Sequence, residues 1–259
     1  MPTKEFQSKI PNLIIPGFDK CGTTTTAIML AEHQEIALPL AECLCGDAIP
    51  TEPMFFLGNA LTNCGDAYPG SSKYRIDATP FYYKRPGLLR RICRHSQNPK
   101  LIILMRDPVE RAISYWNHFS PIVNNDPERE DAFGIRSGFT FSQQIDYELS
   151  GNPGFLIRDS MFYDRLNSLG SIFDPDQIHY GFMEEIRETP RKFFDGIFDF
   201  LEIDKITLKV ETLNARERVF EPDKKGIRKL RTILYEQTTK LKKLTGRIPE
   251  SWGKKTKYE

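Results

Sequence analysis

The sequence predicts an α/β fold in which helices flank a central parallel sheet. Strand and helix candidates alternate along the chain. One continuous apolar run, Leu101–Met105, is typical of a strand that is buried on both faces. A turn that contains glycines joins the first strand candidate to the first helix candidate. We expect a single domain over residues 1–259, with a core at about 12–252.

The elements can be placed one by one. Strands are expected where short apolar runs are bounded by turn residues, at 12–15, 74–77, 101–105 and 177–181. Helices are expected at 23–33, 86–95, 108–119, 140–149, 155–169, 190–201 and 225–244. The last helix has an apolar face that we expect in the core, formed by Ile227, Leu230, Leu234, Leu241 and Leu244. Segments 36–73 and 121–138 have the composition of loops, and long loops are more often functional than idle.

Composition points to an ordinary soluble globular protein, with 39% hydrophobic and 27% charged residues. The five cysteines have no C-x-x-C pair and no nearby histidine, so we expect free thiols in a reducing compartment and no metal site. The first residues lack the apolar segment of a signal peptide, and no apolar run approaches the roughly 18 residues of a membrane span. We therefore expect a cytoplasmic protein.

Charge is distributed unevenly along the chain, although the net charge is only +1. From Arg216 to the end, 14 Lys or Arg residues stand against 6 Asp or Glu residues. A basic C-terminal arm beside an acidic body suggests a local anion site. The alternative, a solvated lysine-rich helix face, explains most of these charges, so we expect few of them to touch a ligand.

The turn after the first strand is suited to bind an anion. It runs from Gly17 to Gly22, with Lys20 inside it, and four threonines follow at 23–26. Backbone N–H groups and the positive end of a helix dipole favour negative charge at such a turn. The glycines fit the spacing of a Walker A nucleotide loop, but Thr23 stands where that motif needs Lys. A surface turn with a solvated lysine is the alternative without a ligand.

A second pair of anion-binding residues follows the buried strand. Arg106 stands at the carboxyl end of Leu101–Met105, where ligands bind in open α/β sheets. Ser114 lies two helical turns further on, so both side chains can point at one phosphate. Arginine supplies a planar fork and a fixed charge for that contact. Without the first loop, Arg106 and Asp107 would be interpreted as a helix cap and Ser114 as a buried hydroxyl.

The motifs together resemble the sulfotransferases that use PAPS (3′-phosphoadenosine 5′-phosphosulfate), most closely the heparan-sulfate and related carbohydrate branch. The resemblance covers 12–252 and rests on four motifs in order: the loop lysine, E-x-x-F-F at 52–56, T-P-x-Y at 79–82 and R-D-P-x-x-R…S at 106–114. It implies a P-loop-like α/β domain that transfers a sulfuryl group from PAPS to a hydroxyl or amine and releases PAP (adenosine 3′,5′-bisphosphate), without a metal.

The resemblance also implies a role for each site residue. Glu52 is the expected catalytic base, since the acceptor must lose a proton as it attacks sulfur. Lys20 is expected to neutralise charge on the leaving phosphate. The nucleotide is expected to bind to Lys20 and to a further set of residues, which comprises Gly22, Thr23, Thr24, Thr25, Arg106, Ser114 and, in the loop 216–218, Arg218. Arg111, in the same motif, is expected to make structural bonds.

Three departures from the family pattern affect this interpretation. Ala78 and Thr51 stand where relatives often have Lys, so the positive charge on the transferred group is expected to rest more heavily on Lys20. Relatives in the Golgi often flank the 216–218 loop with a disulfide. This chain has no cysteine after Cys93, which agrees with a reducing compartment.

The expected acceptor is a glycan or a small molecule, with a carbohydrate favoured, and no nucleic acid is expected as a partner. Two other classes of function stay open. An ATP-dependent kinase of P-loop type would need the Lys that Thr23 replaces. An inactive nucleotide-binding module would not need a base such as Glu52.

Overall fold

A computed structural model describes residues 10–41, 44, 49–57, 67–70, 72–167, 169–209 and 221–252. Its contacts divide the chain into two compact units. The first unit comprises Met1–Met105 and Ser168–Asn214, and the second comprises Arg106–Asn167 and Ala215–Glu259. The expected extent of one domain over 1–259 stays a prediction.

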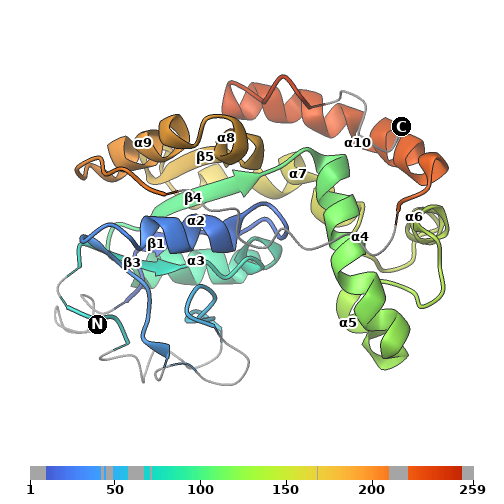
Figure 1. The fold of residues 1–259 in the computed structure, drawn as a ribbon, viewed down its shortest axis with the longest axis horizontal. Coiled ribbons are helices and arrows are strands. Elements are labelled where there is room, and N and C mark those ends of the chain that lie inside the picture. The colour runs from blue at the N-terminus through green and yellow to red at the C-terminus, as the bar shows by residue number, and fades with distance from the viewer. Residues whose placement is uncertain are drawn as a thin grey trace. The chain divides into compact units, whose positions relative to one another are not determined.

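The first unit is built on a parallel five-stranded sheet in the order β2-β3-β1-β4-β5 (Figure 1). The strands are β1 Leu13–Ile14, β2 Ile36–Ala37, β3 Tyr74–Asp77, β4 Lys100–Met105 and β5 Ile178–Phe182. At the centre of the sheet, Ile14 of β1 lies opposite Asp77 of β3 on one side and Leu101 of β4 on the other. The predicted α/β fold with a central parallel sheet is confirmed, and β2 is an additional strand in the segment that the sequence suggested was irregular.

Two helices of the first unit, α2 Thr23–Leu30 and α3 Pro86–His95, lie between strands of this sheet along the chain, and two more, α8 Met183–Glu188 and α9 Pro190–Leu201, follow the last strand. The unit also has the short 3₁₀ turns η3 Tyr82–Lys84, η6 Leu169–Ser171 and η7 Pro175–Gln177. Helices α8 and α9 pack against β5 and against each other. Strand β4 lies at the centre of the core, where Leu101, Ile102, Leu104 and Met105 are fully buried. This burial explains its continuous apolar sequence.

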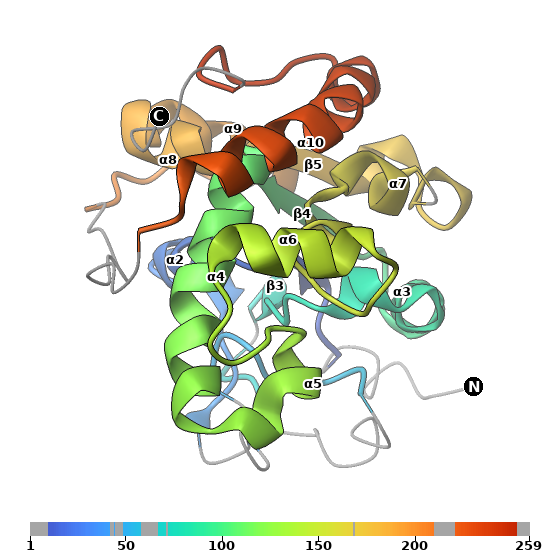
Figure 2. The same cartoon turned by 90° about the vertical axis from the view of Figure 1, so that its right-hand side faces the viewer.

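The second unit is entirely helical within its described residues. Its elements are α4 Pro108–Asn125, η4 Pro127–Arg129, α5 Glu130–Phe133, α6 Phe141–Leu149, η5 Arg158–Ser160, α7 Phe162–Leu166 and α10 Lys224–Thr245. Helix α10 packs against α4, α6 and α7, and Figure 2 shows α4, α6 and α10 together. Their shared core includes Trp116, Phe141, Ile227 and Leu234.

Three expectations about the second unit need correction. Segment 121–138 is not a continuous loop, because α4 runs through Pro121 to Asn125 and is followed by η4 and α5. Segment 155–169 is not one helix: only short turns and α7 form there. Leu244, next to the last residue of α10, is 37% exposed and so lies outside the core, whereas Leu241, one turn earlier, is 1% exposed.

No helix in the described ranges is both long enough and apolar enough to cross a membrane.

Candidate active site

The loop between β1 and α2 is fixed from both sides of β1. On the β4 side, the N–H of Phe18 donates to the Leu104 carbonyl at 3.0 Å, and the N–H of Leu104 donates to Gly17 at 3.2 Å. On the β3 side, the N–H of Tyr83 donates to the Pro16 carbonyl at 3.2 Å. The loop therefore emerges at the carboxyl edge of the sheet between two neighbouring strands. Ligands of open α/β sheets bind at this edge.

Glycine is required at two positions of this loop. Gly17 has a φ of 146°, and a Cβ there would lie only 2.3 Å from Cδ1 of Tyr83. Only glycine therefore lets these two segments approach so closely. Gly22 has a φ of 86° and precedes the first turn of α2. Between them, Lys20 also adopts a left-handed backbone with a φ of 66°. Such a conformation is costly for a residue with a side chain, and strained residues of this kind tend to cluster at functional sites.

The first turn of α2 presents backbone N–H groups. The first intrahelical bond is made by the N–H of Thr26, which donates to the Gly22 carbonyl at 2.9 Å, so the N–H groups of Thr23, Thr24 and Thr25 precede the helical ladder. Within the described chain, no side chain caps this helix and no acidic residue lies in its first turn. An anion at this position would accept these hydrogen bonds and would be stabilised by the helix dipole.

Glu52 lies close to the loop lysine in the first unit. It is half-buried, and its N–H donates to the Ile49 carbonyl at 2.8 Å in an isolated antiparallel bridge. The pKa of Glu52 is raised from 4.5 to about 7, chiefly by burial and further by the negative charges of Asp19 and Asp77. The positive charge of Lys20 opposes this rise. The structure thus brings the predicted base and the predicted leaving-group cation within electrostatic reach of each other.

A buried carboxylate, Asp77, organises the T-P-x-Y motif at the end of β3. Its Oδ1 accepts the hydroxyl of Thr79 at 2.6 Å and the Thr79 N–H at 3.1 Å, and its Oδ2 accepts the hydroxyl of Tyr82 at 2.6 Å. Asp77 is fully buried, and burial raises its pKa to about 6 although these hydrogen bonds oppose the rise. The motif therefore has a structural function, which extends to the loop of Glu52.

The same hydroxyls hold the E-x-x-F-F loop. The N–H of Met54 donates to the Thr79 hydroxyl at 3.0 Å, and the N–H of Phe56 donates to the Tyr82 hydroxyl at 3.0 Å. Phe56 is fully buried, so the loop is fixed by packing as well as by hydrogen bonds. Sequence reasoning missed Asp77. The available signal was an acidic residue that ends a strand directly before T-P-x-Y.

The two positions where relatives carry lysine are buried in this chain. The N–H of Ala78 donates to the Thr51 carbonyl at 2.9 Å, and Ala78 and Thr51 are 0% and 5% exposed. Sequence reasoning also missed Lys84, which donates to Asp19 of the β1–α2 loop at 2.6 Å. This ion pair adds a second lysine beside the loop, and its Asp19 is one of the charges that raise the pKa of Glu52.

The second unit carries Arg106 and Ser114. Arg106 directly follows β4, and its guanidinium donates to Glu110 at 3.2 Å, one helical turn away. Asp107 caps α4 by accepting the N–H groups of Val109 at 2.9 Å and Glu110 at 3.0 Å, as the alternative interpretation of this motif expected. Ser114 is half-buried on α4.

Arg111 makes the structural bonds that were expected of it. It is fully buried and donates to the Phe155 carbonyl at 2.7 Å. Arg218 and the rest of the 216–218 loop lie outside the described residues. Within the described ranges, His, Cys, Asp and Glu side chains form no group of three that could hold a metal ion.

Residues 89–226 match the family model of the sulfotransferase domain. A membrane-associated sulfotransferase of Dictyostelium discoideum is 31% identical over 120 residues, which are 43% of this chain and 23% of that protein. The heparan sulfate glucosamine 3-O-sulfotransferase 3B1 of Mus musculus is 32% identical over 111 residues, which are 41% of this chain and 26% of that protein. The chain thus spans about a quarter of the length of these curated relatives.

The fold is shared with a solved sulfotransferase from Alicyclobacillus acidocaldarius. The two structures superpose with a TM-score of 0.68 over 94% of this chain and 98% of that chain, at 20% sequence identity. At this identity the similarity establishes the fold, and the chemistry depends on the site residues.

Proposed function

Because the chain belongs to the sulfotransferase domain family, we propose that it transfers a sulfuryl group from PAPS to a hydroxyl or amine of an acceptor and releases PAP. The observation that carries this proposal is Glu52, whose carboxyl has a pKa of about 7 and interacts with Lys20 of the β1–α2 loop. A general base is most effective when its pKa lies near the working pH.

The proposed reaction is a single in-line displacement at sulfur. The acceptor oxygen or nitrogen forms the new bond to sulfur, and the bond from sulfur to the bridging oxygen of the 5′-phosphate breaks. The electron pair of that bond stays on PAP, and the acceptor proton moves to Glu52. Lys20 stabilises the charge that develops on the leaving phosphate, as positioned cations do in phosphoryl transfer.

The N-terminus of α2 is the proposed site of the 5′-phosphate. The N–H groups of Gly22, Thr23 and Thr24 cradle its oxygens, and the hydroxyl of Thr24 or Thr25 adds a hydrogen bond. This assignment is supported by the glycine conformations and by a first helical turn without acidic residues in the described chain.

The 3′-phosphate is the proposed ligand of Arg106 and Ser114. Arg106 now donates to Glu110 at 3.2 Å, so a phosphate must compete with that carboxylate for the guanidinium. A dianionic phosphate offers more charge and more acceptor oxygens than the carboxylate does. Arg218 is proposed to close over the nucleotide, on the family resemblance of its loop.

A carbohydrate is the proposed acceptor. The support is that one relative of this chain is named as a heparan sulfate glucosamine sulfotransferase. Small-molecule acceptors remain the alternative that a transfer assay would reveal.

Ligand titration tests the donor. PAP, ATP, and ATP with Mg²⁺ are titrated into the protein while its melting temperature is measured. PAP should raise the melting temperature most, because at equal concentration the ligand that binds the folded protein most tightly stabilises it most. A larger rise with ATP and Mg²⁺ than with PAP would contradict the proposal and favour a kinase.

A further inference from the structure

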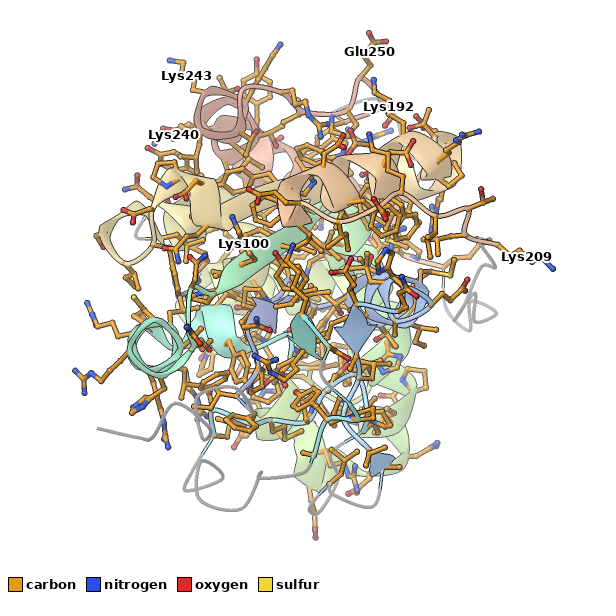
Figure 3. The ribbon with its side chains drawn as sticks, turned by 90° about the vertical axis from the view of Figure 1, so that its left-hand side faces the viewer. Lys100, Lys192, Lys209, Lys240, Lys243 and Glu250 are labelled. Carbon is orange, nitrogen blue, oxygen red and sulfur yellow. The ribbon has the colours of Figure 1, made fainter. Side chains whose placement is uncertain are left out.

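Helix α3 in the first unit carries Arg90, Arg91 and Arg94, and Arg85 is the residue that caps its N-terminus. We call the surface of these four residues the α3 arginine face. No Asp or Glu occurs from residue 78 to residue 106, whereas this stretch contains seven Lys or Arg residues. In Figure 3, which looks nearly along the axis of α3, nitrogen-tipped side chains extend outward from this helix. The stretch is the longest part of the chain that combines many cations with no internal anion.

These arginines are not neutralised by the described part of the protein. Arg85, Arg90 and Arg94 are exposed and Arg91 is half-buried, and none of the four forms an ion pair with a described residue. Some exposed arginines elsewhere do pair. Arg129, for example, donates to Asp126 at 2.9 Å. The charge of the α3 arginine face is therefore available to an external anion.

The protein bears a cost for keeping these charges together. Arg90 and Arg94 are one helical turn apart, and like charges at this spacing destabilise a helix. The pKa of the neighbouring His95 is lowered mainly by burial and further by the positive charges of Arg91 and Arg94. The arginines are not needed for packing, because α3 is anchored by its buried Leu89 and Ile92. An arrangement that costs stability without serving the core suggests a ligand.

The α3 arginine face begins beside the candidate site. It starts one residue after Lys84, which pairs with Asp19 of the β1–α2 loop at 2.6 Å. Since β3 and β4 are parallel, α3 must run from the carboxyl edge of the sheet back to its amino edge. Its ten residues extend for about 15 Å along the flank of the sheet. A polymer with one unit near Glu52 could place its following units on this face.

We propose that the α3 arginine face binds an acidic polysaccharide, with sulfate or carboxylate groups, whose chain continues beyond the acceptor unit. Guanidinium forks match the oxygens of both groups. The choice of a polysaccharide rests on the proposed function. A polysaccharide is also favoured over a nucleic acid and over an anionic membrane surface. The exposed positions of α3 that are not arginine are Pro86, Gly87 and Cys93. These residues offer no aromatic ring for stacked bases and no apolar anchor for a membrane surface.

Heparin binding in the absence of PAPS tests this surface. Fluorescently labelled heparin is titrated with the full chain and with the triple variant Arg90→Ala, Arg91→Ala, Arg94→Ala, over a series of NaCl concentrations. The control, Arg228→Ala, Lys242→Ala, Lys243→Ala, removes the same charge from exposed positions of α10. We expect the Kd to rise about tenfold in the α3 variant and less than about twofold in the control.

The salt dependence gives a second readout. The slope of log Kd against log NaCl concentration should fall by about 2 in the α3 variant, because each lost contact removes roughly 0.7 to 0.9 of released counterion. Equal losses in the α3 variant and the control would overturn the proposal. Tighter arginine-dependent binding of duplex DNA, or of vesicles with anionic lipid, than of heparin would overturn the choice of a polysaccharide.

Separate control experiments check the folding of the variants and the proposed function. Circular dichroism should show an unchanged fold, since the three side chains are exposed or half-buried and alanine favours helices. If the triple variant unfolds, Arg94→Glu is tested in the same titration, and wild-type heparin binding by it would overturn the proposal. The heparin titration contains no PAPS, so its result does not depend on sulfuryl transfer. If the protein binds heparin through α3 but transfers no sulfuryl group in a separate assay with PAPS, only the proposed function is contradicted. Transfer to a small uncharged acceptor, with unaltered heparin binding by the α3 variant, would contradict only this inference.

Discussion

Glu52→Gln should stabilise the protein while it abolishes most of its activity. The folded-state pKa of Glu52 is about 7, against its ordinary value of 4.5. Since one pKa unit corresponds to 1.36 kcal/mol, ionised Glu52 destabilises the folded state by up to roughly 3 kcal/mol at pH 8. Gln keeps the shape but carries no charge that burial and the carboxylates of Asp19 and Asp77 could disfavour.

The sign of the pH dependence follows from the direction of the shift. Because the folded-state pKa is raised, the contribution of Glu52 to stability is most favourable below about pH 4.5 and declines as the pH rises through about 7. Urea unfolding at pH 8 should therefore give Glu52→Gln a higher free energy of unfolding than wild type, and the difference should vanish near pH 4. Glu32→Gln, at an exposed position after α2, is the matched control and should change neither value.

Activity supplies the second half of the same test. General base catalysis contributes about 10²–10⁴-fold, so turnover of Glu52→Gln should fall by that order while PAP affinity barely changes. The wild-type rate should fall as the pH drops through about 7, and the variant should lack this limb. An acceptor of high pKa and one of low pKa are compared, because an already ionised acceptor needs little base. Near wild-type transfer to the high-pKa acceptor, or equal stability at pH 8, would refute the reasoning.

Three further predictions concern the other site residues. Lys20→Ala should lower turnover at saturating PAPS far more than it changes the melting temperature, and near wild-type turnover would contradict the role of the loop. Arg106→Ala should weaken PAP binding by about 1.5–3 kcal/mol in isothermal titration, since a charge-assisted contact is lost; an unchanged Kd would make Arg106 purely structural. Tyr82→Phe should cost about 1–3 kcal/mol in urea unfolding, because Phe56 N–H and Asp77 lose their partner, and it should lower turnover but not PAP affinity.

Local sequence patterns were sufficient to predict the β1–α2 loop and four of the five strands of the sheet, all except β2. The apolar run at β4 and the glycines at 17 and 22 express constraints that act within a few residues, namely burial of one strand and left-handed backbone. Where local patterns failed, tertiary packing determined the secondary structure. Helix α4 continues through Pro121 because Val123, beyond the proline, is fully buried in the core of the second unit.

Side chains distant in sequence explain the other differences. Residues after 154 do not continue as one helix, because the Phe155 carbonyl accepts from Arg111, and Glu148 accepts the N–H groups of Leu156 and Ile157. The partners of the Asp77 network were likewise not predictable from local patterns, although an acidic residue before T-P-x-Y was visible. The network joins Met54 and Phe56 to residues about 25 positions later, and no spacing rule connects two loops.

The central claim is that this chain moves a sulfuryl group from PAPS to an acceptor by means of Glu52 and Lys20. The most direct measurement is an assay with sulfur-labelled PAPS and a panel of glycan and small-molecule acceptors, in which labelled product and PAP are both quantified. We predict labelled product and PAP in equal amounts with wild type, and a loss of about 10²–10⁴-fold with Glu52→Gln. Equal product formation by wild type and Glu52→Gln, or binding of PAP without label in any acceptor, would contradict the account.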